Sequence, residues 1–394
     1  MSDVEKNSGT HKPEFDGEWV KLGDVATYVN GYAFKPSDYS ADGLPIIRIQ
    51  NLTGNVYETN RFSGTLPEKF KVANGDILIS WSASLGVYRW SHGDAWLNQH
   101  IFKVVFDKLP VNVDFFVYQA GYLIENSANL AHGATMRHLT KKVFDSRPFY
   151  YPSSAIQARI ARNLASIDVL LGSLRCQLST LDDLVKSQFV EMFGDTYSNS
   201  KQLPSRKLGA LIDFITSGSR GWSKYYSDEG DYFITIKNVR GCSISLDNVQ
   251  HVHAPNNKEA ERTKVQSGDV LISITADLGR TGVVSKEIAD HGAYINQHLA
   301  CIRLAGEDIL PLYLSFFLES PGAKDQLQRK NQTGVKAGLN FDLVKSLDIL
   351  VPPLALQQQF ADFVARVDKL GFDVQQQIEK LETLKQSLMQ EYFG

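Results

Sequence analysis

The chain has 394 residues, of which 43% are hydrophobic and 22% are charged, and its formal net charge is −3. This composition is typical of a globular protein of two or three domains. No apolar run reaches the roughly 20 residues of a membrane span, and the start lacks the basic and apolar regions of a signal peptide. We therefore expect a cytoplasmic protein in which residues 1–17 form a disordered tail.

The first domain is expected over residues 18–152. It begins with short runs rich in Val, Ile, Tyr and Phe that are broken by Gly, Asn and Asp, a pattern that predicts strands. The run GDILIS (75–80) is typical of a turn followed by a buried strand. A helical stretch follows near residues 112–130. Strands followed by helices indicate an α+β domain rather than a doubly wound sheet.

A long helix is predicted next, over residues 153–195. Its apolar residues alternate at spacings of four and three, which is the pattern of a coiled-coil seam. At 1.5 Å per residue, about 40 residues would form a helix roughly 60 Å long. The seam consists of Ile160, Leu164, Ile167, Leu171, Leu174, Leu178, Leu181 and Val185.

The rest of the chain repeats this plan, with a second domain over 196–351, including a helical stretch near 308–331. GDILISWSASLG (75–86) returns as GDVLISITADLG (268–279), and NQHIFKVVF (98–106) returns as NQHLACIRL (296–304). The offset between the copies grows from 187 at Asn51 and Asn238 to 200 at Gln157 and Gln357. A stepwise growth predicts extra residues in the loops of the second copy, where insertions are tolerated.

A second long helix, over residues 352–394, carries the same seam 200 residues later. The two helices can bury their seams against each other, and antiparallel pairing would place the two domains at opposite ends of a rod. The alternatives are that each helix packs on its own domain or dimerises with another chain. We favour the internal pair because it satisfies both seams within one molecule. The second seam is Phe360, Val364, Val367, Gly371, Val374, Ile378, Leu381, Lys385 and Leu388.

Both helices also carry an apolar stripe off the seam. A stripe that solvent should not contact predicts a surface for a protein partner, with packing on the chain's own domains as the alternative. The stripe consists of Leu170, Leu184, Phe189, Phe193, Leu370, Leu384, Met389 and Phe393.

Motifs for catalysis are missing from the sequence. There is no G-x-x-x-x-G-K-[ST] loop for a nucleotide, and Pro352-Pro353 follows Val351, so it is a helix entry and not a methyltransferase motif. His100 and His298 have no carboxylate or cysteine partner at metal-ligand spacing. Three scattered cysteines predict neither disulfides nor a zinc site. We expect no catalytic residue, cofactor or metal.

The repeated arrangement resembles the specificity subunits of type I restriction-modification systems. The resemblance covers Trp19 to Gly394 and includes GDILIS/GDVLIS, NQH/NQH and the helix entries YPSSAIQARIA and VPPLALQQQFA. It implies two target recognition domains that bind a split, asymmetric double-stranded DNA sequence. It also implies that the helices set the spacing and dock two methyltransferase subunits, which restriction subunits then join. The alternatives are the specificity subunit of another modification or phage-defence system, and a coiled-coil scaffold for protein or glycan.

The duplication separates framework positions from reading positions. Two domains that share a fold but read different bases should agree where loops are held and differ where bases are contacted. Asp76 and Asp269 agree, as do the two NQH motifs, so we expect these residues to hold loops by side-chain to backbone hydrogen bonds, with phosphate contact as the alternative.

The loop positions that differ are predicted to contact DNA bases. Arg and Lys can bond guanine, Gln suits adenine, and Thr or Trp can meet a thymine methyl. The alternatives are core packing for the aromatic residues and a solvated surface for the basic ones. The candidates are Tyr32, Phe34, Lys35, Arg48, Gln50, Trp81, Ser82 and Ser84 in the first copy, with Arg220, Trp222, Lys224, Lys237, Arg240, Thr275 and Asp277 in the second.

Two basic stretches lie at matching places in the copies. The negative net charge argues against nucleic-acid binding, so the distribution of charge must decide. The stretches contain Arg137 and Lys141 in the first copy, and Lys330 and Lys336 in the second. We expect them to contact phosphates, which position a protein on DNA without specifying sequence.

Overall fold

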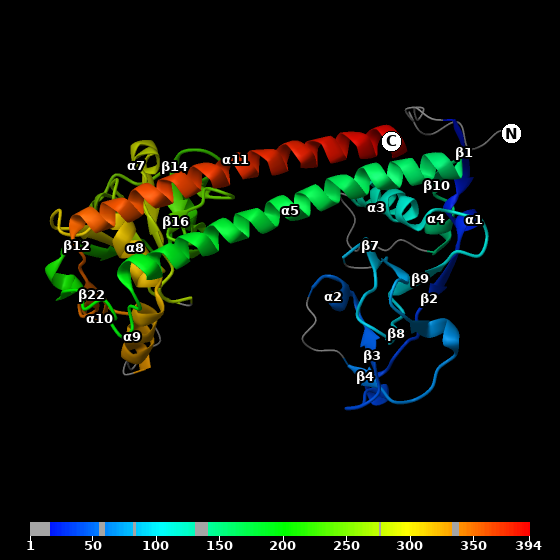
Figure 1. Ribbon diagram of the computed structural model, residues 1–394, viewed down its shortest axis with the longest axis horizontal. Helices are drawn as coiled ribbons and strands as arrows, with labels where there is room; N and C mark the ends of the chain where they lie inside the picture. The colour runs from blue at the N-terminus through cyan, green and yellow to red at the C-terminus, as the bar shows by residue number, and fades with distance from the viewer. Residues whose placement is uncertain (1–15, 55–59, 82–83, 131–140, 276, 333–338) are drawn as a thin grey trace. The chain divides into compact units, whose positions relative to one another are not determined.

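The computed structural model describes residues 16–54, 60–81, 84–130, 141–275, 277–332 and 339–394. The chain forms two compact units (Figure 1). Unit 1 combines Met1–Arg175 with Gln375–Gly394, and unit 2 is Cys176–Val374. Each unit contains a strand-rich mixed α/β domain and a segment from each of two long helices. In the described part of the chain, no helix is long and apolar enough to cross a membrane.

Unit 1 is built on two four-stranded sheets. In the antiparallel sheet β2-β9-β6-β7, all four residues of β6 are buried, as the GDILIS pattern predicted. In the sheet β4-β3-β8-β5, strands β3 and β8 are parallel. The strands are β2 Thr27–Asn30, β3 Leu44–Ile47, β4 Arg61–Phe62, β5 Lys71–Val72, β6 Ile77–Ser80, β7 Gly86–Arg89, β8 Ala95–Leu97 and β9 Ile101–Val105.

A two-stranded ladder closes the unit 1 domain. Strand β1 (Gly17–Lys21) pairs antiparallel with β10 (Pro148–Pro152), directly before the first long helix. β1 begins at Gly17, the last residue of the segment predicted to be a tail, and residues 1–15 of that segment lie outside the described residues. The helices are α1 Leu22–Val25, α2 Ile49–Leu52, α3 Val113–Leu130 and α4 Lys141–Asp145, with short 3₁₀ turns at Pro36–Asp38 and Glu68–Phe70.

Unit 2 repeats this topology. The sheet β12-β21-β18-β19 is antiparallel with β18 fully buried, the sheet β13-β17-β14-β20 contains the parallel pair β14–β20, and β11 pairs with β22. The strands are β11 Ser205–Lys207, β12 Ile212–Ser217, β13 Tyr226–Ser227, β14 Asp231–Ile234, β15 Val239–Arg240, β16 Ser243–Ile244, β17 Gln250–Val252, β18 Val270–Ser273, β19 Thr281–Val283, β20 Ala293–Ile295, β21 Leu299–Leu304 and β22 Asp348–Leu350. Helical turns lie at Leu208–Ala210, Trp222–Tyr225 and Ile236–Asn238, and α10 at Phe341–Lys345.

The second copy differs from the first in two places where the expectations need correction. Its extra residues do not form loops alone, because they include the capped helices α6 (Lys258–Thr263) and α7 (Lys286–His291). The helix expected near 308–331 is two helices, α8 (Pro311–Glu319) and α9 (Pro321–Gln332). The break lies at Ser320, which has extended backbone angles (φ −66°, ψ 156°) because the proline that follows disfavours a helical conformation.

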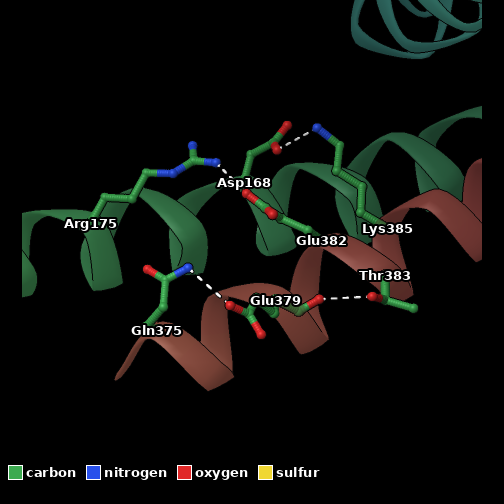
Figure 2. A network of polar contacts seen from close by, with 7 residues as sticks. All are labelled: Asp168, Arg175, Gln375, Glu379, Glu382, Thr383 and Lys385. Atoms are coloured by element: carbon green, nitrogen blue, oxygen red, sulfur yellow. Dashed lines mark hydrogen bonds and ion pairs between the residues drawn. The ribbon is translucent and has the colours of Figure 1, made fainter. Parts of the chain in front are cut away.

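The two long helices are α5 (Ser154–Phe193) and α11 (Leu354–Phe393), with 40 residues each. In unit 1 their segments run antiparallel, since Asn163 bonds Tyr392 while Asp168 bonds Lys385 (2.6 Å). Figure 2 shows the pair of Asp168 and Lys385 together with that of Arg175 and Glu382. In unit 2 the segments are likewise antiparallel. There the Phe189 and Phe360 rings lie 5.4 Å apart, and Leu178 lies beside Gly371.

Candidate nucleic-acid interface

The NQH motifs hold equivalent loops in the two units. In unit 1 the Asn98 N–H donates to Ile47 O (3.3 Å) and the Gln99 N–H donates to Tyr32 O (3.0 Å). Gly31 lies so close that a Cβ there would be 2.1 Å from Asn98 O. The unit 2 counterparts are Asn296 N–H to Ile234 O (3.0 Å) and Gln297 N–H to Ser219 O (3.1 Å), with Gly218 in place of Gly31. These bonds join main-chain groups. The predicted side-chain to backbone bond is seen within the second motif, where Asn296 Oδ1 accepts the His298 N–H (3.1 Å).

Side chains at two other shared positions also bond backbone groups, which confirms the framework role. Asp76 Oδ2 accepts the Ala73 N–H (2.8 Å), and Asp269 Oδ2 accepts the Gln266 N–H (2.7 Å). The same bond links Asn51 Oδ1 to the Arg48 N–H (2.8 Å) and Asn238 Oδ1 to the Thr235 N–H (3.0 Å). These bonds fix the loops from which the differing side chains project.

In unit 1, several differing residues form an aromatic cluster. The Tyr32 ring lies 5.0 Å from that of Phe34, which in turn lies 5.5 Å from Phe62, and both candidates are half-buried. Lys35 and Gln50 are exposed. The remaining unit 1 candidates are Arg48, half-buried over the Tyr39 ring, Trp81, half-buried and stacked on Phe102 at 5.7 Å, exposed Ser84, and Ser82, which lies outside the described residues.

In unit 2, one aromatic candidate is corrected. Trp222 is only 3% exposed and stacks on Phe233 at 5.6 Å, so its indole is core packing and not a contact for DNA. Its neighbours in the same loop, Arg220 and Lys224, are exposed. Lys237 is also exposed, while Thr275 is half-buried and its hydroxyl lies 2.6 Å from His298 Nδ1.

The structure brings two unit 2 candidates together in one pocket. Arg240 and Asp277 line a cavity of about 790 Å³ together with Arg280, Glu319 and Lys324. The sequence prediction did not include the last three. The available signal was the charge of Arg280 directly after the shared Leu-Gly pair.

The basic stretches are only partly described. Lys141 is exposed and pairs with Asp145 in α4 (2.9 Å). It lines a shallow hollow of unit 1 with Lys21 and Lys142, so three ammonium groups gather at this place. Arg137 and Lys336 lie outside the described residues, and Lys330 belongs to α9 without a described side chain.

The apolar stripe divides into an exposed part and a buried part. Leu170, Leu184, Leu370 and Leu384 are 45–55% exposed. Phe189 and Phe193 are buried against Tyr313 of α8, and Phe393 is buried 5.6 Å from Phe115 of α3, so the expectation of a partner surface is corrected for these three. Met389 is half-buried against the unit 1 core.

Known proteins match this chain over both of its repeats. A family model described as the type I restriction modification DNA specificity domain matches residues 16–175 and 206–383. The EcoBI specificity subunit of Escherichia coli is 23% identical, with 95% of this chain and 85% of that protein covered. The MjaVIII specificity subunit of Methanocaldococcus jannaschii is 21% identical, with 97% and 92% covered.

Solved structures show the same fold. The S subunit of a type I restriction-modification system from M. genitalium superposes with a TM-score of 0.53 at 15% identity, with 97% of each chain covered. A chain from a structure concerning complex assembly and conformational transition of the type I R-M system gives a TM-score of 0.54 at 16% identity, with 97% of this chain and 99% of that one covered.

Proposed function

The chain belongs to the family of type I restriction modification DNA specificity domains, and we propose that each of its two repeated domains reads one half of a split, asymmetric target. The recognition domains are residues 18–152 and 196–351. One observation carries this proposal: the two units share a hydrogen-bonded loop framework but present different side chains from it. A shared framework with divergent loops is what two readers of different sequences require, and base contacts rather than phosphate contacts supply that specificity.

We further propose that the segments 153–195 and 352–394, which contain α5 and α11, form an antiparallel coiled coil that sets the distance between the half-sites. The ion pair between Asp168 and Lys385 supports this proposal, because Lys385 is the one charged residue on either seam. A polar residue at a seam position fixes the register of the helices. A fixed register would give a fixed spacer between the half-sites.

The exposed leucines supply a docking surface in this proposal. Leu170 and Leu384 of unit 1, and Leu184 and Leu370 of unit 2, are exposed on the long helices, and exposed large apolar side chains indicate a protein partner. We assign them to two methyltransferase subunits, through which restriction subunits join. The chain itself would then contribute no catalytic residue, cofactor or metal site. Its DNA target would place it in the cytoplasm.

The lysines of unit 1 are proposed as phosphate contacts. Lys21, Lys141 and Lys142 share one hollow that also contains two carboxylates, Asp24 and Asp145. Three ammonium groups leave an excess positive charge there. Lys141→Ala should weaken binding to all sequences alike and reduce the salt dependence by about one unit of slope.

The experiment that tests the function begins with a search of the genome for a methyltransferase gene next to that of this chain, and the two proteins are then co-expressed. The purified complex is supplied with S-adenosylmethionine and genomic DNA, and the methylated positions are mapped. The account predicts that the two proteins co-purify and that methylation falls on one motif with two defined halves. A methyltransferase that does not bind, or methylation without a split motif, would favour the scaffold alternative.

A further inference from the structure

Unit 2 contains a charged pocket at the end of its buried antiparallel sheet. Its walls carry three cations, Arg240, Arg280 and Lys324, and two carboxylates, Asp277 and Glu319. Arg240 is exposed on β15, and in the described part of the chain its guanidinium makes no ion pair. Leu278 and Leu327 supply apolar wall beside these groups. The pocket therefore offers free donors and acceptors side by side.

Backbone contacts hold the base of the pocket in place. The Ser273 N–H donates to Arg280 O (2.8 Å), and the Arg280 N–H donates to Ser273 Oγ (2.9 Å). The Arg280 guanidinium pairs with Asp277, which restricts where it can point. Glu319 Oε1 accepts the Thr281 N–H (2.8 Å), and among the described residues no bond engages Oε2. One carboxylate oxygen is thus anchored and the other is available.

Two of the charged positions, Arg280 and Glu319, correspond to glycines in unit 1. Ser80 pairs with Gly86 where Ser273 pairs with Arg280, so Gly86 occupies the place of Arg280. Leu310 and Asn112 match because the backbone N–H of each donates to the equivalent glutamine of a long helix. Glu319 lies nine residues after Leu310 and Gly121 lies nine residues after Asn112, so Gly121 takes the place of Glu319. The charges of the pocket therefore belong to the divergent positions of the repeat, where reading of sequence is expected.

The side-chain types in this pocket fit the edge of a base pair. Two planar guanidinium groups and a free carboxylate oxygen lie side by side, whereas the unit 1 hollow offers only ammonium groups as cations. A guanidinium fork can bond two acceptors on one base, and the amino groups of bases donate to carboxylates. Arginine bonds guanine O6 and N7 in the major groove, and Glu accepts from cytosine N4. Resting on the proposed function, we propose that this pocket reads a G·C base pair in the half-site of unit 2, with the arginines on guanine and Glu319 on cytosine.

The test uses the complex of the full chain with its methyltransferase and short duplexes that carry the mapped motif. Arg280→Ala and Arg240→Ala should each weaken binding of the cognate duplex by about 5- to 150-fold. The same variants should lose the preference for G·C at one position of the unit 2 half. Arg280→Lys should also lose this preference, because lysine lacks the planar fork of donors. Its salt dependence should not change, because the charge is kept.

Glu319→Gln and Arg206→Ala complete the design. Glu319→Gln should alter the preference at the same base pair, whereas Arg206→Ala, a surface arginine paired with Asp308 outside the pocket, should leave the motif unchanged. An equal loss on every sequence, or a change in the unit 1 half, would overturn the pocket assignment while leaving the split motif intact. A wild-type complex with no split motif would overturn the proposed function itself.

Discussion

Gln157 and Gln357 make the same pair of buried hydrogen bonds at the start of the two long helices. Gln157 Oε1 accepts the Asn112 N–H (2.9 Å), and its Nε2 donates to Pro152 O (2.8 Å). Gln357 does the same with Leu310 N–H (2.8 Å) and Pro352 O (2.8 Å). Each glutamine thus ties the start of a long helix to the residue directly before a shorter helix of its own unit, α3 in unit 1 and α8 in unit 2.

We expect Gln357→Ala and Gln157→Ala each to lower the free energy of unfolding by about 1–3 kcal/mol, because the backbone groups left behind are buried without a partner. The methylation motif should not change, since neither side chain belongs to a loop that carries the candidate base-contacting residues. Gln359→Ala, at an exposed position two residues further along α11, is the control. Urea unfolding measures all three, and a loss no larger than that of Gln359→Ala would contradict the buried role.

The two framework aspartates should differ in their contribution to stability. Asp269 is 1% exposed and pairs with Arg303 through both oxygens (2.8 and 2.7 Å). Asp76 pairs with Lys103 (2.9 Å) in a more exposed site. Removal of one partner from a buried pair costs about 3–5 kcal/mol, so Asp269→Asn should destabilise unit 2 by about that amount.

Asp76→Asn should destabilise unit 1 by less, about 1.5–3 kcal/mol, because water can solvate the remaining lysine. The exposed Asp290→Asn serves as the control and should stay within about 0.5 kcal/mol of the unmodified chain. Thermal unfolding with proteolysis of each unit separates the two effects. A larger loss for Asp76→Asn than for Asp269→Asn would refute this ranking.

The thiols should react unequally. Cys176 is exposed, whereas burial raises the pKa of the Cys242 thiol to about 12, with Glu319 adding to the rise, and raises the pKa of Cys301 further. The thiolate is the reactive form, so at pH 8 Cys242 is charged in only about one molecule in ten thousand. A thiol reagent should modify one cysteine in the native chain and three in guanidinium. Cys176→Ser should remove the native reaction, and a fast second equivalent would show that a buried thiol is accessible.

The exposed leucines should bind the methyltransferase. Leu184→Asp and Leu384→Asp should reduce its co-purification by at least tenfold, because a carboxylate in an apolar interface loses its hydration. Helix content should be unchanged, since both side chains are nearly half exposed. Gln386→Asp adds the same charge at an exposed position on another face of α11 and should have no effect. If either leucine variant unfolds the chain, the leucines are internal packing and not a dock.

The framework could be predicted from the sequence because it occurs twice. Matched residues such as Asp76 and Asp269 indicated loop-holding contacts, and the buried strands followed from GDILIS and GDVLIS. For aromatic residues in divergent loops, the repeat did not indicate which side chains are buried. Trp222 and Trp81 both stand at unmatched positions, yet Trp222 is buried and Trp81 is half-buried. Whether a loop aromatic packs inward depends on neighbours from other strands, and a single sequence does not place these.

The ends of the long helices show a second limit. Phe189, Phe193 and Phe393 followed the periodicity of an exposed stripe, yet they pack against α8 and α3 of their own units. Helical periodicity identifies which side chains share a face, but it does not say how many neighbours that face has. The pocket of unit 2 was hidden for a related reason, because Arg280 and Glu319 have only glycines as counterparts.

If each domain reads one half-site independently, exchange of one domain should change only one half of the target. Residues 205–350 should be replaced together by the equivalent domain of a relative, because β11 and β22 pair with each other and must be exchanged as a unit. The methylation motif of the resulting complex is then read from host DNA. The account predicts one altered half, with the other half and the spacer unchanged. A motif in which both halves change together would contradict it.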